Sequence, residues 1–211
     1  MTKSILLVGV GGQGTILASK ILTTGLMEAG YDVKMSEIHG MSQRGGSVSS
    51  QVRYAEDKGE KVMSPVIEKG KADIVVSFEK MEALRALDYL KEDGTLVVNN
   101  EEIPSMSVIT GEEEYPEDVF EEINKHVEAK VVNATALARE LGNEKAANMI
   151  LLGTIIKAMG LEAIDWDSIL SANIKPQFVE LNKKALRVGM DAVACNSIKK
   201  RLWVLSRGFK M

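Results

Sequence analysis

SILLVGVGGQG, the sequence of residues 4–14, places a glycine-rich turn between an apolar run and a helical stretch, Thr15 to Ala29. In a G-x-G-x-x-G turn the first glycine permits a tight turn, the second allows close backbone approach, and the third lets the helix pack near the strand. Gly9, Gly11 and Gly14 occupy these positions. The first N–H groups of a helix lack partners within it and attract anions. The stretch therefore predicts the start of a Rossmann-like fold, with the turn as an anion site.

Strand and helix patterns alternate through most of the remaining chain, which favours a mostly parallel sheet covered by helices on both faces. The fold class is α/β and Rossmann-like, with extra helices near the C-terminus. The predicted strands are residues 31–37, 48–54, 72–78, 95–99 and 130–133. The predicted helices are residues 79–91, 135–141, 144–159, 167–172 and 176–188, and a further helix opens near Pro116. Glu92-Asp93-Gly94 is predicted to end the helix at 79–91.

We expect one domain over residues 1–193 and a separate basic tail over residues 194–211. The tail contains Lys199, Lys200, Arg201, Arg207 and Lys210 and no acidic residue. Such a terminal segment is either disordered or a docking arm. The opposite charge gathers in residues 112–122, which contain acidic residues and no base. Both segments are typical of a solvated surface.

Composition excludes several classes of protein. The net charge of -4 over 211 residues argues against a nucleic-acid partner. We predict no signal peptide, no membrane span and a cytoplasmic protein, because the apolar runs are too short. With one cysteine and two histidines, the chain lacks the roughly four thiolates of an iron–sulfur cluster and the ligands of a structural zinc site. We therefore expect this chain to bind no metal.

A second polar, glycine-rich segment, HGMSQRGGSV, covers residues 39–48. Arg44 offers a planar fork of donors that suits carboxylate or phosphate. Gly45 and Gly46 expose backbone N–H groups, and Ser47 adds a hydroxyl. In a doubly wound sheet, loops at the carboxyl ends of strands lie beside the first glycine turn. We interpret Arg44, Gly45, Gly46 and Ser47 as a binding site or a subunit interface.

Two readings of the neighbouring residues stay open. Glu37 lies near the position where a dinucleotide-binding protein holds the ribose, so the Gly9–Gly14 turn and Glu37 are compatible with NAD or FAD, and the alternative function is a stand-alone NAD- or FAD-binding oxidoreductase. The same glycines equally serve a backbone turn with Glu37 as a loop carboxylate. His39 is either a general base or a hydrogen-bond partner of the turn. We assign no catalytic residue to the chain.

A third feature is Asn148-Met149-Ile150-Leu151-Leu152-Gly153, in a helix that is apolar nearly all round. Such a helix is typical of a core or a subunit interface. A glycine within a helix costs about 1 kcal/mol relative to alanine. A close helix crossing or a partner contact would explain Gly153.

Together these three segments resemble the gamma-type domain of the 2-oxoacid:ferredoxin oxidoreductase family, over roughly residues 3 to 190. The segment from Gly40 to Gly46 is the most specific of the three. Its Met41-Ser42-Gln43 form points to the indolepyruvate branch of the family rather than the pyruvate branch.

The resemblance implies a small (beta) subunit that is inactive alone. Its complex would convert aryl pyruvates such as indolepyruvate to an acyl-CoA and pass electrons to ferredoxin. Thiamine diphosphate, Mg²⁺ and 4Fe-4S clusters are expected on the large (alpha) partner subunit, with coenzyme A as co-substrate. Gly9, Gly11, Gly12, Gln13 and Gly14 are then a candidate anion site. Arg44 to Ser47 would meet an anionic group of coenzyme A or substrate at the subunit interface.

Overall fold

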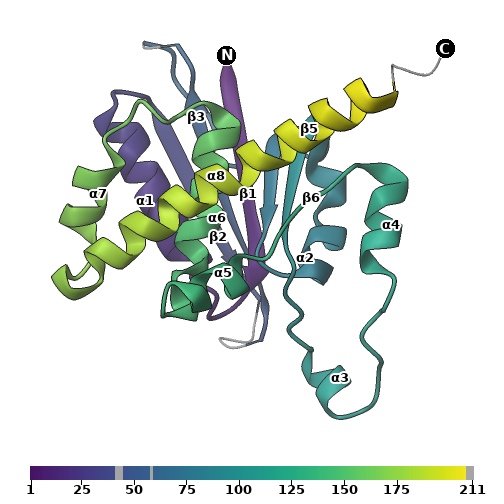
Figure 1. The fold of residues 1–211 in the computed structure, drawn as a ribbon. Coiled ribbons are helices and arrows are strands. Elements are labelled where there is room, and N and C mark those ends of the chain that lie inside the picture. Colours follow the sequence, from purple (N-terminus) through teal and green to yellow (C-terminus); the bar gives the residue numbers. More distant parts are fainter. Residues whose placement is uncertain (41–44, 58, 208–211) are drawn as a thin grey trace.

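A six-stranded sheet in the order β2-β3-β1-β4-β5-β6 forms the middle layer of the fold (Figure 1). The structure is a computed structural model that describes residues 1–40, 45–57 and 59–207, and of 194–207 only the backbone. The strands are β1 (Thr2–Val10), β2 (Val33–His39), β3 (Ser47–Ala55), β4 (Ala72–Ser77), β5 (Leu90–Asn99) and β6 (Lys130–Val132). The predicted mostly parallel α/β sheet is confirmed.

Strand β3 is the exception to the parallel arrangement. β1, β4, β5 and β6 pair in parallel, whereas β3 runs antiparallel to both of its neighbours, β1 and β2. Antiparallel strands need only a short connection, which the segment between His39 and Ser47 supplies. β3 thus enters the sheet between β1 and β2, where a dinucleotide-binding fold would pair those two strands directly.

Helices cover both faces of the sheet (Figure 1). Along β1, Ile5 and Leu7 join the core beneath α1 and α6, while Leu6 and Val8 join the core beneath α2 and α4. This alternation follows from the two-residue period of a strand. The helices are α1 (Thr15–Glu28), α2 (Lys80–Arg85), α3 (Met106–Ile109), α4 (Val119–His126), α5 (Ala134–Glu140), α6 (Ala147–Met159), α7 (Trp166–Asn173) and α8 (Pro176–Arg207). Short 3₁₀ turns lie at Leu87–Tyr89 and Glu144–Ala146.

No helix in the described part of the chain has the length and apolar character needed to cross a bilayer.

Helices α6 and α8 cross at two glycines. A Cβ atom added to Gly153 would lie 2.2 Å from the Leu186 carbonyl oxygen, and one added to Gly189 would lie 1.9 Å from the Ile150 carbonyl oxygen. Both distances are far below contact distance, so the two backbones approach as only glycine allows. The close helix crossing predicted at Gly153 is thus present. The backbone of α8 continues without a break through Arg207, and the domain boundary at residue 193 stays a prediction.

The predicted helix at residues 79–91 is wrong in its second half. Helix α2 ends at Arg85, and β5 already begins at Leu90. Glu92-Asp93-Gly94 therefore lies inside β5 instead of ending a helix. The cause is sheet pairing: Ala72 of β4 pairs with Leu90 across a register irregularity, and a Cβ on Gly94 would lie 3.0 Å from the Ala72 carbonyl oxygen. Tertiary pairing overrides the local helical pattern.

Replacing Gly153 by alanine is expected to lower the free energy of unfolding by about 1–3 kcal/mol, because the added methyl group forces α6 and α8 apart. Chemical denaturation measures the change. Asp191→Ala, at an exposed position of α8, is the control and is expected to stay within about 0.5 kcal/mol of the wild type. Equal stability of Gly153→Ala and wild type would contradict the close crossing.

Candidate functional site

The register between β1 and β3 brings the two glycine segments together. Val10 pairs with Ser47 at the end of the ladder, and the Gly11 N–H donates to the Gly46 carbonyl oxygen at 2.9 Å. The Gly40 N–H in turn donates to the Ser47 carbonyl oxygen at 2.8 Å. The predicted proximity of the two segments is therefore present in the fold. Residues 41–44, which include Arg44, lie outside the described residues, so the role of Arg44 stays a prediction.

The Gln13 side chain clamps the first turn. Its Oε1 accepts the Val10 N–H at 2.8 Å, and its Nε2 donates to the Phe78 carbonyl oxygen at 2.8 Å. A Cβ on Gly9 would lie 2.8 Å from that Oε1, so only glycine leaves room for the amide. Gln13 therefore joins the end of β1 to the chain leaving β4. This gives Gln13 a structural role within the candidate anion site.

Helix α1 begins without a side-chain cap at its N-terminus. Gly14 is the N-cap residue with φ 80°, and no side chain caps the helix or places a carboxylate in its first turn. Gly12 also has a positive φ, 104°, a conformation that glycine adopts without steric cost. The uncapped N–H groups and the helix dipole favour an anion here.

Asn148 is a candidate site residue in a helix that the sequence predicted to be part of the core or of a subunit interface. It lies at the start of α6 and is 6% exposed, and its side-chain nitrogen would lie 2.5 Å from a Cβ on Gly14. Its buried Oδ1 has no hydrogen-bond partner. An unpaired buried polar atom is costly, so Asn148 is poised to bind a polar group. The signal in the sequence was an amide in the first turn of an otherwise apolar helix.

A cavity of about 580 Å³, here called the turn cavity, lies between the glycine turn and α6. Gly12, Gln13 and Gly14 form one wall and Asn148 another. Arg139 and Glu144, whose Nε and Oε2 atoms are 3.1 Å apart, lie at its edge with Lys145. The volume is in the range of small-molecule sites, and the wall holds the uncapped helix end.

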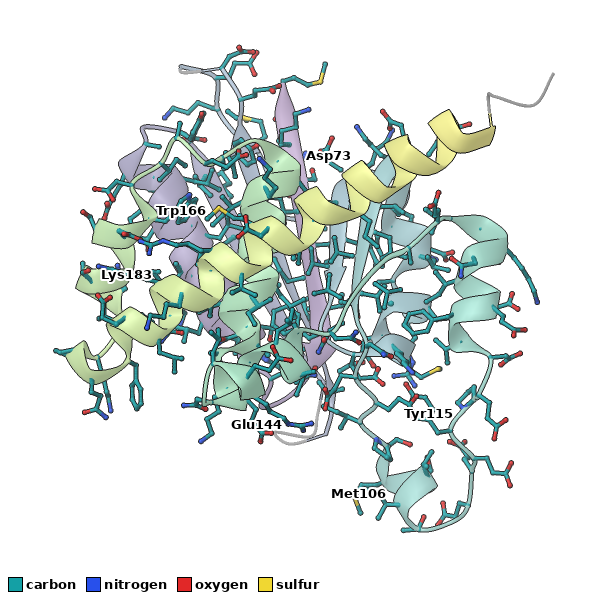
Figure 2. All side chains as sticks on the ribbon, viewed as in Figure 1. Asp73, Met106, Tyr115, Glu144, Trp166 and Lys183 are labelled. Atoms are coloured by element: carbon teal, nitrogen blue, oxygen red, sulfur yellow. The ribbon has the colours of Figure 1, made fainter. Side chains whose placement is uncertain are left out.

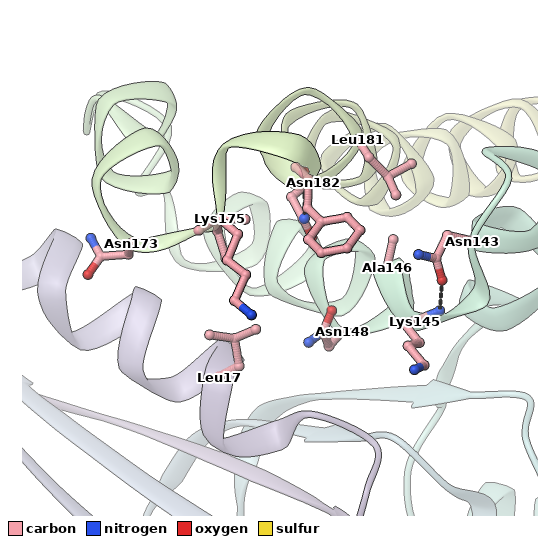
Figure 3. A pocket seen from close by; sticks show the side chains of 11 residues that line it. Leu17, Asn143, Lys145, Ala146, Asn148, Asn173, Lys175, Leu181 and Asn182 are labelled. Atoms are coloured by element: carbon pink, nitrogen blue, oxygen red, sulfur yellow. Dashed lines mark hydrogen bonds between the residues drawn. The ribbon is translucent and has the colours of Figure 1, made fainter.

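A second cavity of about 340 Å³, here called the outer cavity, shares Leu17, Lys145 and Asn148 with the first. Figure 3 shows the Lys175 side chain reaching from the α7–α8 connection toward Leu17 and Asn148. Further amides line it together with apolar side chains: Asn143, Asn173, Asn182, Ala146, Ile174, Phe178 and Leu181. Two lysines and no carboxylate make this cavity suitable for an anionic group next to an apolar one.

On the other side of the turn, a cavity of about 610 Å³ is lined by Gly11, Gly12, His39 and Gly40, among others. His39 Nε2 lies 3.7 Å from Glu37 Oε2. Because β3 separates β2 from β1, Glu37 is on a strand two spacings away, roughly 10 Å. That separation removes Glu37 from the ribose position of a dinucleotide site, and the NAD or FAD reading is not favoured.

Two buried carboxylates at α2 support residues 45–47, here called the rim of the site. Glu82, 6% exposed, accepts the Ser47 hydroxyl and binds Arg85 at 2.5 Å. Glu79, 1% exposed, caps α2 by accepting the Glu82 N–H at 3.0 Å. Ser47 is thereby held in place by α2. Among the described residues, no group of histidine, cysteine, aspartate and glutamate side chains is arranged to hold a metal ion.

Comparisons with known proteins place this geometry in context. A sequence model of the pyruvate ferredoxin/flavodoxin oxidoreductase family matches residues 4–192. The chain is 37% identical over 197 residues to the indolepyruvate oxidoreductase subunit IorB of Pyrococcus horikoshii, across 90% of this chain and 95% of that protein.

Two solved structures share the fold. Pyruvate oxidoreductase subunit PORC from Thermotoga maritima is 25% identical with a TM-score of 0.67, covering 90% of this chain and 96% of that one. A 2-oxoglutarate:ferredoxin oxidoreductase from Magnetococcus marinus is 20% identical with a TM-score of 0.69. That likeness covers 92% of this chain and 31% of the other, so the fold also occurs as one part of a longer chain.

Gln13→Met removes both hydrogen bonds of the clamp while keeping a side chain of similar length. We expect it to lower the free energy of unfolding by about 1–3 kcal/mol, because the Val10 N–H and the Phe78 carbonyl lose their partner. Denaturant titration measures this. Lys20→Met, at an exposed position of α1, is the matched control. A Gln13→Met protein no less stable than Lys20→Met would show that the clamp contributes nothing.

Proposed function

The chain belongs to the pyruvate ferredoxin/flavodoxin oxidoreductase family, and from this premise we propose that it is the small subunit of an indolepyruvate-type 2-oxoacid:ferredoxin oxidoreductase. The observation that carries the proposal is the 37% identity to an indolepyruvate oxidoreductase subunit IorB over nearly the whole of both chains. The Met41-Ser42-Gln43 sequence between β2 and β3 supports the proposal, because it has the form of the indolepyruvate branch. The pairing of β1 with β3 supports it too, because it brings the two glycine segments of the family resemblance together.

The proposed complex oxidatively decarboxylates aryl pyruvates such as indolepyruvate, forms an acyl-CoA and reduces ferredoxin. Thiamine diphosphate, with Mg²⁺, and 4Fe-4S clusters belong to the large subunit in this proposal. When bound there, thiamine diphosphate would supply the electron sink for decarboxylation, and the clusters would carry the electrons. This chain supplies binding and positioning, and it is inactive alone.

Within the complex, this chain binds an anionic group of coenzyme A. The uncapped N-terminus of α1 and the amine of Lys145 border the turn and outer cavities, and the unpaired Oδ1 of Asn148 accepts a hydrogen bond from an N–H or O–H group of the same ligand. An anion at the helix N-terminus gains from the free N–H groups and the dipole. We further propose that Arg44, with Gly45, Gly46 and Ser47, meets an anionic group of coenzyme A or of the substrate at the interface with the large subunit.

Co-expression with the large subunit tests the proposed function. A tag on this chain is expected to retain a brown complex that reduces ferredoxin or a dye with indolepyruvate and coenzyme A, while the chain alone is colourless and inactive. NAD and FAD are expected to leave the melting temperature of the chain unchanged, whereas a true ligand at 100 times its Kd adds about 2.7 kcal/mol. A chain that purifies alone and is stabilised by NAD or FAD would overturn the proposal.

Arg44→Ala in the reconstituted complex is expected to raise the KM for coenzyme A or for the oxoacid about tenfold or more. The reason is that a hydrogen bond to a charged group contributes about 1.5–3 kcal/mol, and about 1.4 kcal/mol is a factor of ten. Steady-state kinetics with each substrate varied in turn measure it. Arg187→Ala, which breaks only the α8–α7 ion pair with Asp167 at 2.6 Å, is the matched control. Unchanged constants for both substrates would rule out the role of Arg44.

A further inference from the structure

Residues 101–118, here called the arm, leave the sheet after the carboxyl end of β5. The chain returns to the body of the protein at α4, which packs on one face of the sheet. Figure 1 shows the arm projecting away from the three layers, with the short helix α3 at its outer end. The turn cavity includes Glu101 and Ile103 at the root of the arm. A chain that covers the arm therefore also reaches the edge of the candidate site.

A buried carboxylate holds both ends of the arm at its root. Glu79 Oε1 accepts the Ile103 N–H at 3.3 Å and the Tyr115 hydroxyl at 2.5 Å. Burial and this hydrogen bond raise the pKa of Tyr115, so the phenol stays a donor. Lys80 adds an ion pair with Glu102 at 2.5 Å. Figure 2 shows Tyr115 close to the body, well back from the tip. The arm is thus anchored in a defined direction.

The outer end of the arm satisfies its own backbone and exposes apolar side chains. Ser107 accepts the N–H groups of Glu112 and Glu113 at 2.9 and 3.1 Å through its carbonyl oxygen. Met106 and Ile109, three residues apart on one face of α3, are 67% and 65% exposed. In Figure 2, Met106 lies at the outer end of the arm, away from the core. These two side chains do little for the stability of the monomer, because neither is buried.

Charge indicates which partner covers this face. The arm contains no lysine or arginine, and its acidic residues are Glu101, Glu102, Glu112, Glu113, Glu114, Glu117 and Asp118. A second copy of this chain, with net charge -4, would bring the same carboxylates to a symmetric arm contact, where like charges repel. An apolar pocket rimmed by lysine or arginine on a different chain fits the arm better.

We propose that the arm docks on the large partner subunit, with Met106 and Ile109 in an apolar pocket and the carboxylates of residues 112–118 facing basic side chains around it. The proposal rests on the proposed function, because it takes the large subunit as the occupant. Because the root of the arm lines the turn cavity, a large subunit docked on the arm also covers the edge of the site.

The test measures the Kd between the separately purified full-length chain and the large subunit. Met106→Ser with Ile109→Ser is expected to weaken binding at least tenfold. The matched control is Met63→Ser with Val66→Ser, because these side chains are 88% and 54% exposed. The Val66 carbonyl accepts a hydrogen bond from Arg53, which pairs with Ser4 near the start of β1, so the segment lies at the amino ends of the parallel strands, away from the arm. The control is expected to bind like the wild type. Circular dichroism and denaturation confirm that each variant is folded.

A second pair of variants tests the charges. Wild-type affinity is expected to fall as salt rises, because screening weakens the acidic contacts. Glu112→Gln with Glu117→Gln is expected to reduce that salt dependence. Glu68→Gln with Glu92→Gln, at exposed positions just before β4 and near the amino end of β5, is expected to leave it unchanged.

The outcomes separate the two proposals. A wild-type chain that does not bind the large subunit overturns the proposed function and the docking together. Wild-type binding that survives in the Met106/Ile109 variant, or that falls equally in the Met63/Val66 control, overturns the docking alone. Self-association of the isolated chain that the Met106/Ile109 variant abolishes would identify a second copy as the occupant, and it would also overturn the docking.

Discussion

The antiparallel pairing of β3 with β1 is the constraint on which the rest of the site depends. It ends with Val10 opposite Ser47 and with a hydrogen bond from Gly11 to Gly46 at 2.9 Å. A shift by one residue would turn every side chain of β3 to the other face and move Val52 out of the core. The buried pattern of β3 therefore determines how the glycine segments meet. The same insertion separates Glu37 from the first turn, so the glycine motif lacks the acidic ribose partner of a dinucleotide site.

The close approach of α6 and α8 at two glycines positions α6, which forms the second wall of the turn cavity. Gly153 and Gly189 let α6 and α8 cross with their backbones almost in contact. That crossing holds α6 against the sheet, and the first turn of α6 then brings Asn148 against Gly14. Gln13 holds the other side of the same turn through Val10 and Phe78. The uncapped end of α1 is thus fixed from two directions, which is what a preorganised anion site requires.

Buried carboxylates connect this edge of the sheet to its surroundings. Glu82 holds Ser47, and Glu79 holds the root of the arm. The Glu82 N–H donates to the Glu79 carboxylate at 3.0 Å and so links the two residues. Buried charges are tolerated only when they are hydrogen-bonded or paired, and both glutamates meet that condition. The rim segment and the arm are therefore attached to one short helix. A partner that covers this edge would contact both.

The sequence alone determined the α/β class, the strand–turn–helix at residues 4–28 and the family resemblance, because these depend on local apolar periodicity and on glycines at set spacings. It also indicated that Gly153 needs a close neighbour. It did not determine the start of β5 at Leu90, the position of β3, or the place of Asn148 beside Gly14. These depend on residues far apart in the chain: Ala72 pairs with Leu90, Val10 with Ser47, and residue 148 packs against residue 14. Only tertiary structure decided them, because pairing and packing between distant segments overrule local propensity.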